Sequence, residues 1–564
     1  MRKLAIVLLL VLVVAHAENY VVVNSYDGRD VLSGIFYADV LGYPVKFMPS
    51  EGGDAATLAS KIGYNHDILL IQSEELPITI FLKEELERRN NTVNMYTSSD
   101  GMETNLDLAV RSGTNKFIIV ESAFSDGALS AIPYAKITGS YVVMAGPDNI
   151  DRVVDVVRTA DEITVYGYVD SSVTDALEPF NPKVIGKGED RYEDNVAIAD
   201  KIMKDFNKRD VIMVEGTFIE EGMITGSIPI VFSGRIVPQV TYDFIKEKTK
   251  NDEISTIYLI GGTQITNAVK NMRSQIKNEL GLTNSSFGIW MRFAQIVPGE
   301  SGMMILDVFE LPAYIPELEI TEVVYNTANG NIMITVDNIG VGPAYYTNEV
   351  HILVDETEYK VFGNDEPVLI EYGDTAGIEY AFDPSEIEEG NITAVVIVKY
   401  GSSKYILEEY DDYVGSLIDI SYADQSEVSA REARYDTSKE IIYLSLKNDK
   451  GDIAYVSPDI TLVLDGEQTT LQGPNNEPIN GNSLIVVEFP VKLSSEDLAA
   501  NDEVTVHLKY GGRPGFLTKE STETLPLEKE GFDFLMILLI LLVVLLVILA
   551  AYLIWKNMRK KGGK

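Results

Sequence analysis

The chain of 564 residues has 46 basic and 86 acidic side chains, giving a formal net charge of −40 at pH 7. A surface this acidic repels nucleic acid, so we exclude nucleic acid as a partner. The chain has no cysteine, which excludes disulfide bonds and thiolate metal sites, and it is long enough for several domains with their own cores.

The N-terminus has the pattern of a secretory leader. Arg2 and Lys3 precede an apolar run at 4–14, and a small-x-small cleavage site follows it. We interpret residues 1–17 as a signal peptide, so the mature chain is expected outside the cytoplasm. An exposed chain can carry N-linked glycans, and the Asn-x-Ser/Thr acceptors are Asn90, Asn284 and Asn391.

The first half of the chain contains one sequence unit three times. The string LSGIFYADVLG at 32–42 returns as LSAIPYAKITG at 129–139, and the longer unit that contains it has a looser third copy at 210–239. Each unit alternates short apolar strands with helices, which predicts βαβ units on a parallel sheet. We therefore expect three Rossmann-like α/β repeats, whose limits are 18–92, 93–182 and 183–285.

The repeated string itself predicts a closely packed helix. Small residues give it a narrow face for the sheet, and Gly42 and Gly139 are expected to end it in the left-handed conformation. Pro133 should kink the second copy or divide it into two short helices. Ser125 or Asp126 is expected to cap that helix.

These repeats resemble a known family. The segment GEDRYEDNVAIADKI at 188–202, with VIMVEGTFIEEGMITGSIP and IYLIGGTQITNAV after it, resembles the cell wall binding repeat 2 family over about 19–281. AFSDGALSAIPYA at 123–135 is similar to the helix motif of that family. The resemblance implies a trefoil of α/β lobes that attaches a surface protein to an anionic wall polymer. The positions that match the family motif are Phe124, Asp126, Asp190, Arg191, Tyr192, Glu193, Gly261 and Gly262.

The repeats differ from one another at this motif. Only the third keeps the Asp-Arg-Tyr-Glu start, whereas the second reads DGMETNLDLA at 100–109 and lacks the Arg-Tyr pair. The first repeat starts directly at its strand.

After a linker predicted at 286–316, alternating strands replace the helices. The pattern occurs twice at a separation of 110 residues, which predicts two immunoglobulin-like antiparallel β-sandwiches at 317–415 and 425–527, joined by the segment 411–424. They resemble CARDB-type domains in VDNIGVGPAYY and VKYG, and such modules act as spacers. The paired positions include Asn338 and Asn448, Tyr345 and Tyr455, and Tyr400 and Tyr510.

No catalytic constellation is visible in the sequence. His66, His351 and His507 lack metal-ligand spacing, and the IGG at 260–262 lacks the glycine pattern of a nucleotide site. NDKGD at 448–452 could bind Ca²⁺ or form a tight turn. We expect no enzyme activity, no catalytic or metal site and, apart from this Ca²⁺ option, no cofactor.

The C-terminus predicts a membrane anchor. Residues 534–555 carry no charge and suit one transmembrane helix, and the tail at 556–564 is basic, which places it in the cytoplasm. The prediction is a single-pass type I protein at the cell surface.

Together these features predict a membrane-anchored structural protein of an archaeal-type envelope, similar to surface-layer (S-layer) proteins. Its expected partners are the cell membrane and either envelope polysaccharide or neighbouring copies of itself. The alternatives are a tethered solute-binding or adhesin receptor and, third, an enzyme that uses carboxylates on glycan.

Overall fold

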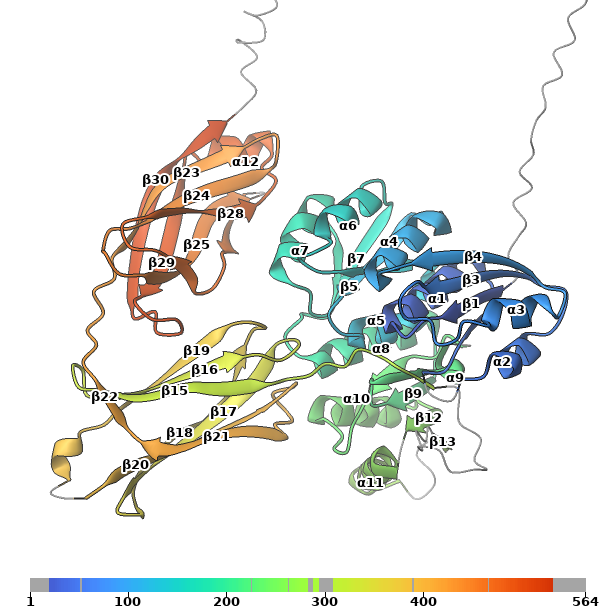
Figure 1. Cartoon of the computed structure of the whole chain (residues 1–564), viewed down its shortest axis with the longest axis horizontal. Helices are drawn as coiled ribbons and strands as arrows, with labels where there is room; N and C mark the ends of the chain where they lie inside the picture. Colours follow the sequence, from blue (N-terminus) through green and yellow to red (C-terminus); the bar gives the residue numbers. More distant parts are fainter. Residues whose placement is uncertain are drawn as a thin grey trace, which may run out of the picture. The chain divides into compact units, whose positions relative to one another are not determined.

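The structure, a computed structural model, describes residues 20–50, 53–224, 226–261, 263–282, 288–293, 308–387, 390–464 and 466–530 (Figure 1). It divides into two compact units, one ending at Ser421 and the other beginning at Tyr422. Within the described ranges, no helix has both the length and the apolar character needed to cross a membrane. The predicted signal peptide, transmembrane segment 534–555, basic tail and Asn284 lie outside these ranges.

The first unit begins with three α/β subdomains that share one sheet order. Each sheet has four parallel strands, in the orders β2-β1-β3-β4, β6-β5-β7-β8 and β11-β9-β12-β13. In the first subdomain the strands are β1 (Tyr20–Asn24), β2 (Val45–Phe47), β3 (Asp67–Ser73) and β4 (Thr92–Ser98), with helices α1 (Gly28–Leu41), α2 (Ala55–Ile62) and α3 (Leu82–Glu87).

The second and third subdomains repeat this arrangement. The second contains α4 (Gly101–Ser112), β5 (Lys116–Glu121), α5 (Asp126–Thr138), β6 (Tyr141–Ala145), α6 (Ile150–Val157), β7 (Glu162–Tyr166), α7 (Ser171–Leu177), η1 (Glu178–Phe180) and β8 (Lys183–Ile185). The third contains α8 (Arg191–Phe206), β9 (Asp210–Val214), β10 (Phe218–Glu220), α9 (Glu221–Ile224), β11 (Ile230–Phe232), α10 (Gln239–Lys250), β12 (Thr256–Gly261), α11 (Thr263–Glu279) and β13 (Gly288–Phe293).

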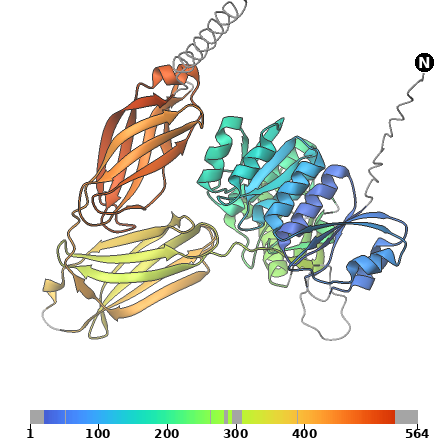
Figure 2. The same ribbon diagram turned by 45° about the horizontal axis from the view of Figure 1, so that its top comes forward.

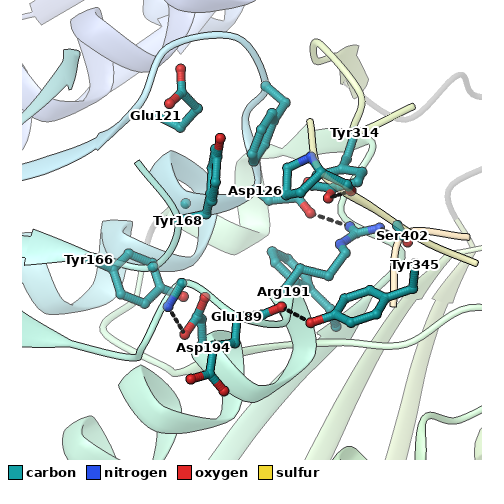
Figure 3. Close-up of a pocket in the computed structure, with 16 residues that line it drawn as sticks. Glu121, Asp126, Tyr166, Tyr168, Glu189, Arg191, Asp194, Tyr314, Tyr345 and Ser402 are labelled. Atoms are coloured by element: carbon teal, nitrogen blue, oxygen red, sulfur yellow. Dashed lines mark hydrogen bonds and ion pairs between the residues drawn. The ribbon is translucent and has the colours of Figure 1, made fainter. Parts of the chain in front are cut away.

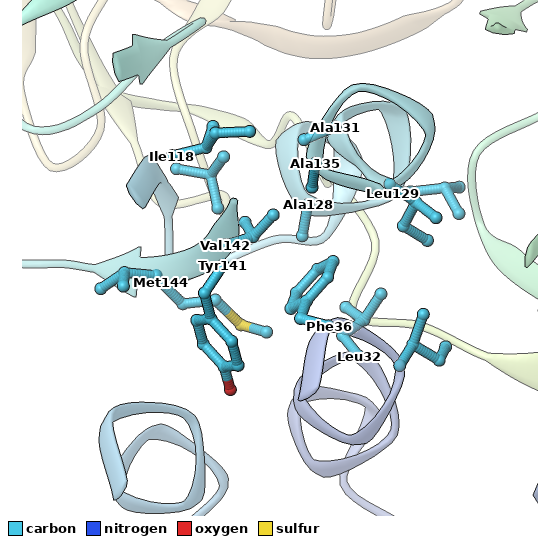
Figure 4. Close-up of a cluster of buried hydrophobic side chains, with 14 of the residues drawn as sticks. Leu32, Phe36, Ile118, Ala128, Leu129, Ala131, Ala135, Tyr141, Val142 and Met144 are labelled. Carbon is cyan, nitrogen blue, oxygen red and sulfur yellow. The ribbon is translucent and has the colours of Figure 1, made fainter. Parts of the chain in front are cut away.

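The repeated string forms the helices α1 and α5, which pack in a core shared by the subdomains (Figure 4). Both helices end at a left-handed glycine, Gly42 at φ 72° and Gly139 at φ 68°, as predicted. A Cβ at Gly34 would lie 2.5 Å from Cγ2 of Val23, so this glycine is what lets α1 approach its sheet. The predicted division at Pro133 is wrong: α5 is one helix, because burial along its length outweighs the lost amide donor.

One charged position in the repeated string differs between copies and joins the subdomains. It is Asp39 in α1 and Lys136 in α5, and Lys136 Nζ lies 2.7 Å from Asp39 Oδ1. The same Nζ donates to the carbonyl of Ile224 in the third subdomain, at 3.0 Å. A single ammonium group therefore contacts all three subdomains.

The predicted linker 286–316 carries structure instead. β13 completes the third sheet, and β14 (Val308–Glu310) pairs with β10. We call residues 308–314 the strap, because they also contact the other two subdomains. Phe309 packs edge-on against Phe47 of the first, and the carbonyl of Pro312 accepts from the Ser125 amide of the second.

A first β-sandwich follows the strap (Figure 2). One sheet has the order β19-β16-β15-β22 and the other β18-β17-β20-β21, and their apolar faces enclose one core. The strands are β15 (Leu318–Asn326), β16 (Asn331–Asn338), β17 (Ala344–Val354), β18 (Thr357–Ile370), β19 (Thr375–Ala381), β20 (Ile392–Gly401), β21 (Glu409–Ser416) and β22 (Ile418–Ile420), with η2 (Pro384–Glu386).

The second structural unit is the second sandwich, with its own core. Its strands are β23 (Val428–Asp436), β24 (Ile441–Asn448), β25 (Ala454–Leu464), β26 (Glu467–Gln472), β27 (Glu477–Ile479), β28 (Leu484–Pro490), β29 (Glu503–Gly511) and β30 (Lys519–Glu530), with α12 (Ser495–Ala500). β30 pairs with β29 and then with β23.

Two predictions about the sandwiches need correction. The segment 411–424 is largely strand, since β21 and β22 complete the two sheets of the first sandwich. The sandwiches are also not purely antiparallel: β22 runs parallel to β15, and the end of β30 runs parallel to β23. In both sandwiches the end of the chain segment crosses from one sheet to the other, as two strands, β21 and β22, in the first and as the single strand β30 in the second. The crossing segment then runs parallel to the first strand of its sandwich.

Candidate functional site

A buried ion pair between the second and third subdomains joins two of the family-motif positions, Asp126 and Arg191 (Figure 3). Arg191 begins α8, and its guanidinium pairs with the carboxylate of Asp126 at the start of α5. The two side chains are only 13% and 6% exposed. We call this ion pair and the residues that contact it the motif joint.

Aromatic rings surround the guanidinium of Arg191. Its Cζ lies 5.1 Å from the ring centre of Tyr192, 5.3 Å from that of Tyr314 and 5.8 Å from that of Phe232. Phe124 packs edge-on against Tyr314, with ring centres 4.7 Å apart. Cation–π contacts of this kind stabilise a charge that has lost part of its water.

The rest of the motif fastens the third subdomain to the first sandwich. Asp190 caps α8 through Oδ1, which accepts from the Tyr192 amide at 2.9 Å. Its Oδ2 accepts from the Ser403 hydroxyl at 2.7 Å and from the Lys404 amide at 3.3 Å. Both carboxylate oxygens of one buried residue are thus used, one within α8 and one across the joint.

Glu193 and Arg191 contact the same sandwich loop. The Glu193 carboxylate accepts from the Tyr405 hydroxyl at 2.7 Å and lies 3.0 Å from Lys404 Nζ. Arg191 donates to the Ser402 hydroxyl at 3.3 Å. We call residues 402–406 the docking loop.

Burial shifts the acidity of the carboxyl groups at the joint. It raises the pKa of Asp126, although Arg191 opposes the rise, and it raises the pKa of Glu121. It also raises the pKa of Asp194 to about 6, against the amides of Lys187 and Gly188, which donate to this carboxylate. These groups sit where water is scarce.

The joint is too closed to hold a substrate. The cavity lined by Asp126, Arg191, Tyr168 and Tyr345 measures about 30 Å³, which is room for a water molecule or two. Its polar groups are mostly engaged with one another, and Tyr345 donates to the Glu189 carbonyl. The geometry is that of a structural connection.

Not every predicted site residue lies at the joint. Phe124, Asp126, Arg191 and Tyr192 do, and Asp190 and Glu193 bond the docking loop beside it. Gly261 instead ends β12 in the third sheet, and Gly262 lies outside the described residues. Ser125 occupies the N-cap position of α5, as predicted, but its side chain makes no capping bond, and the Asp126 carboxylate pairs with Arg191.

Sequence reasoning missed the partners of the motif on the sandwich. Ser403 and Tyr405 lie more than 200 positions beyond Asp190 and Glu193. Their one signal was the run SSKY directly after the repeated Tyr-Gly at 400–401, which the second sandwich replaces by GRPG.

The joint between the first and second subdomains uses a different arginine. Arg29 on α1 pairs with Asp27, with Nε 3.0 Å from Oδ1. The helix facing it, α4, has Gly101 where α8 has Arg191, and a Cβ there would lie 2.5 Å from Asp27 Oδ2. The second repeat lacks the Arg-Tyr pair at the start of α4. Arg29 of the first subdomain, which lies against this helix start, provides an arginine there instead.

The remaining predicted positions are placed as follows. Asn90 and Asn391 are exposed, and the side chain of Asn90 donates to Asn65. In NDKGD, Asn448 donates to the Asp452 carbonyl, while Asp449 pairs with Arg431 and Lys447. Among the described residues no three His, Cys, Asp or Glu side chains are grouped as metal ligands.

The fold defines a multidomain protein with N-terminal α/β repeats and C-terminal β-sandwiches. No family model matches the sequence, and no curated protein matches it. Among solved structures, Cwp8 from Clostridium difficile is similar at 15% identity and a TM-score of 0.37, over 47% of this chain and 48% of that one. The chain therefore spans about half the length of Cwp8.

A second similar structure is the ligand binding region of serine-glutamate repeat protein A from Enterococcus faecium. It matches at 15% identity and a TM-score of 0.14, over 19% of this chain and 99% of that one. The YadV chaperone matches at 11% identity and a TM-score of 0.15, over 37% and 99% of the two chains.

Proposed function

We propose that this chain is a structural protein of the cell surface, similar in role to S-layer proteins. The observation that carries the proposal is the motif joint. Asp190, Arg191 and Glu193 hold the docking loop, so the motif that resembles a wall-binding repeat fastens α/β subdomains to a spacer domain. The proposal includes no catalytic role and no cofactor.

Sequence features outside the described residues supply the rest of the proposal. A leader at 1–17, an apolar segment at 534–555 and a basic tail would retain the protein in the membrane with its repeats outside. The acidic surface would keep such a crowded protein soluble. Partners would be neighbouring copies or envelope polysaccharide.

Imaging of native envelopes together with fractionation tests this role. If the chain is structural and anchored, it remains with membranes after alkaline carbonate washing, and envelopes show an ordered array that disappears when the chain is depleted. A glycan pull-down with residues 18–530 tests polysaccharide attachment separately. Release by carbonate together with envelopes that show no array would contradict the proposal.

The pull-down needs the longer fragment for a structural reason. A fragment ending at 285 would lose β13 from the third sheet and the strap that contacts all three subdomains. A negative result with the short fragment would therefore report misfolding as readily as lack of binding.

A second candidate function is a tethered solute-binding receptor. It is favoured by a groove of about 430 Å³ beside the motif joint, which lies within the size range of ligand sites. A gain of thermal stability with a small ligand would support it, and a flat response across a ligand panel would not.

A further inference from the structure

The groove beside the motif joint has two walls of opposite charge. One wall belongs to the third subdomain and carries Arg235, in the loop after β11, with Tyr192 on α8. The other belongs to the first sandwich and its entry segment, and carries Tyr400 and three carboxylates, those of Glu317, Glu408 and Glu409.

These charged side chains are exposed. Arg235 makes no ion pair within the described ranges, and the three glutamates likewise make none there. Burial raises the pKa of Glu215, a rise that Arg235 opposes, and Glu215 does not line the groove. Arg191 also lines it, but the Asp126 carboxylate balances that guanidinium.

Apart from the balanced Arg191, the lining of the groove therefore carries one positive side chain and three negative ones. A ligand that complements it carries one carboxylate for Arg235 and two ammonium groups for the glutamates. Charge-assisted bonds at both ends would fix its orientation, because guanidinium prefers a carboxylate partner. Tyr192 and Tyr400 also line the groove, and their rings offer apolar surface suited to a short methylene chain.

We propose that this groove binds a free basic amino acid of the lysine type. The carboxylate lies at Arg235, the α-ammonium on the same carbon lies toward Glu317, and the side-chain ammonium lies toward Glu408 and Glu409, with the methylenes across the tyrosine rings. The inference rests on the second candidate function, whereas envelope imaging tests the first, so the two can fail separately.

Calorimetric titration of the full-length protein with three matched ligands tests the proposal. L-lysine has all three groups, cadaverine lacks the carboxylate, and L-norleucine lacks the second amine. We expect L-lysine to bind and each analogue to bind at least about tenfold more weakly. No heat with L-lysine up to about 10 mM, or equal binding of the three ligands, would overturn the proposal.

Variants at exposed positions test which protein residues bind each end of the ligand. Arg235→Gln should reduce L-lysine binding at least about tenfold, to the level of cadaverine, and leave cadaverine binding unchanged. The double change Glu408→Gln and Glu409→Gln should weaken L-lysine and cadaverine but not L-norleucine. Arg158→Gln, an arginine 65% exposed in the second subdomain, is the matched control. Unchanged L-lysine binding in Arg235→Gln would overturn the assignment.

Discussion

The Arg191–Asp126 pair shows how one residue can join three elements. Its guanidinium contacts the carboxylate on α5, the rings of Tyr192 and Tyr314, and the docking loop through Ser402. A buried charge with a good partner adds little net stability, but removing that partner leaves the other charge uncompensated. The pair therefore fixes the arrangement of the joint.

This gives a prediction for Arg191→Met. The change leaves the Asp126 carboxylate buried without a cation and should lower the free energy of unfolding by about 3–5 kcal/mol. The double variant Arg191→Met with Asp126→Leu should recover most of that loss, because both buried charges are then gone. Urea unfolding followed by circular dichroism measures both, and additive losses would contradict the assignment.

The raised pKa of Asp194 predicts how the stability of the fold changes with pH. Burial raises its pKa in the folded chain to about 6, so between pH 6 and 4 the folded state holds a proton that the unfolded state releases. This group's stabilisation is lost as pH rises through 6 and grows as pH falls, by at most about 1.4 kcal/mol per pH unit.

The measurement compares unfolding free energies at pH 7 and pH 5. Asp194→Asn should flatten the dependence, because the amide keeps an oxygen for the Lys187 and Gly188 donors but does not titrate. Asp205→Asn, at an exposed ion pair with Lys201, should leave it unchanged. Equal pH profiles for the wild type and Asp194→Asn would refute the assignment.

At the scale of elements, the strap is a segment that hydrophobic periodicity did not predict. β14 is three residues long, too short to show alternation, yet Val308, Phe309 and Leu311 are all buried in the shared core. At Gly28 a Cβ would lie 2.8 Å from Pro312 Cδ. The close approach of the strap therefore requires a glycine at this position of the first subdomain.

Phe309→Ala tests the strap. Its ring is 1% exposed and packs edge-on against Phe47, so truncation should cost about 3–5 kcal/mol of unfolding free energy through lost burial and a cavity. The control Phe81→Ala removes the same ring at a site 62% exposed and should change stability by no more than about 0.5 kcal/mol. Equal effects of the two would show that the strap does not contribute.

Two asparagines show the same dependence on distant elements. Asn105 on α4 donates to the Val142 carbonyl and accepts from the Met144 amide, and Asn195 on α8 bonds Ile230 and Phe232 in the same way. Each bonds the backbone of an edge strand, β6 or β11. Their matching positions were visible in the sequence, but the strands they bond were not.

For the molecule as a whole, the division at Tyr422 separates the core of the second sandwich from the cores of the first unit. The second sandwich closes its sheets with its own last strand, β30, and so needs nothing from the first unit to complete them. The three subdomains, by contrast, share one core and the strap.

Fragments test this difference. Residues 422–530 should fold alone and unfold cooperatively in calorimetry. Residues 18–285 should unfold at a lower temperature and less cooperatively than residues 18–421, because the short fragment lacks β13 and the strap. A short fragment as stable as the long one would contradict this account.

The sequence by itself determined the repeat architecture. Periodicity and self-similarity predicted three α/β subdomains and two sandwiches, and glycine chemistry predicted where α1 and α5 end, because these features depend on local conformation and on the burial of one face.

Only the tertiary structure decided what the motif residues contact. Asp126 does not cap its own helix, Asp190 bonds a loop 213 positions away, and the predicted linkers complete sheets. Such contacts depend on which surfaces the folded subdomains bring together, and hydrophobic periodicity carries no record of that pairing. The local elements were therefore predictable, whereas the joint and the groove between them were not.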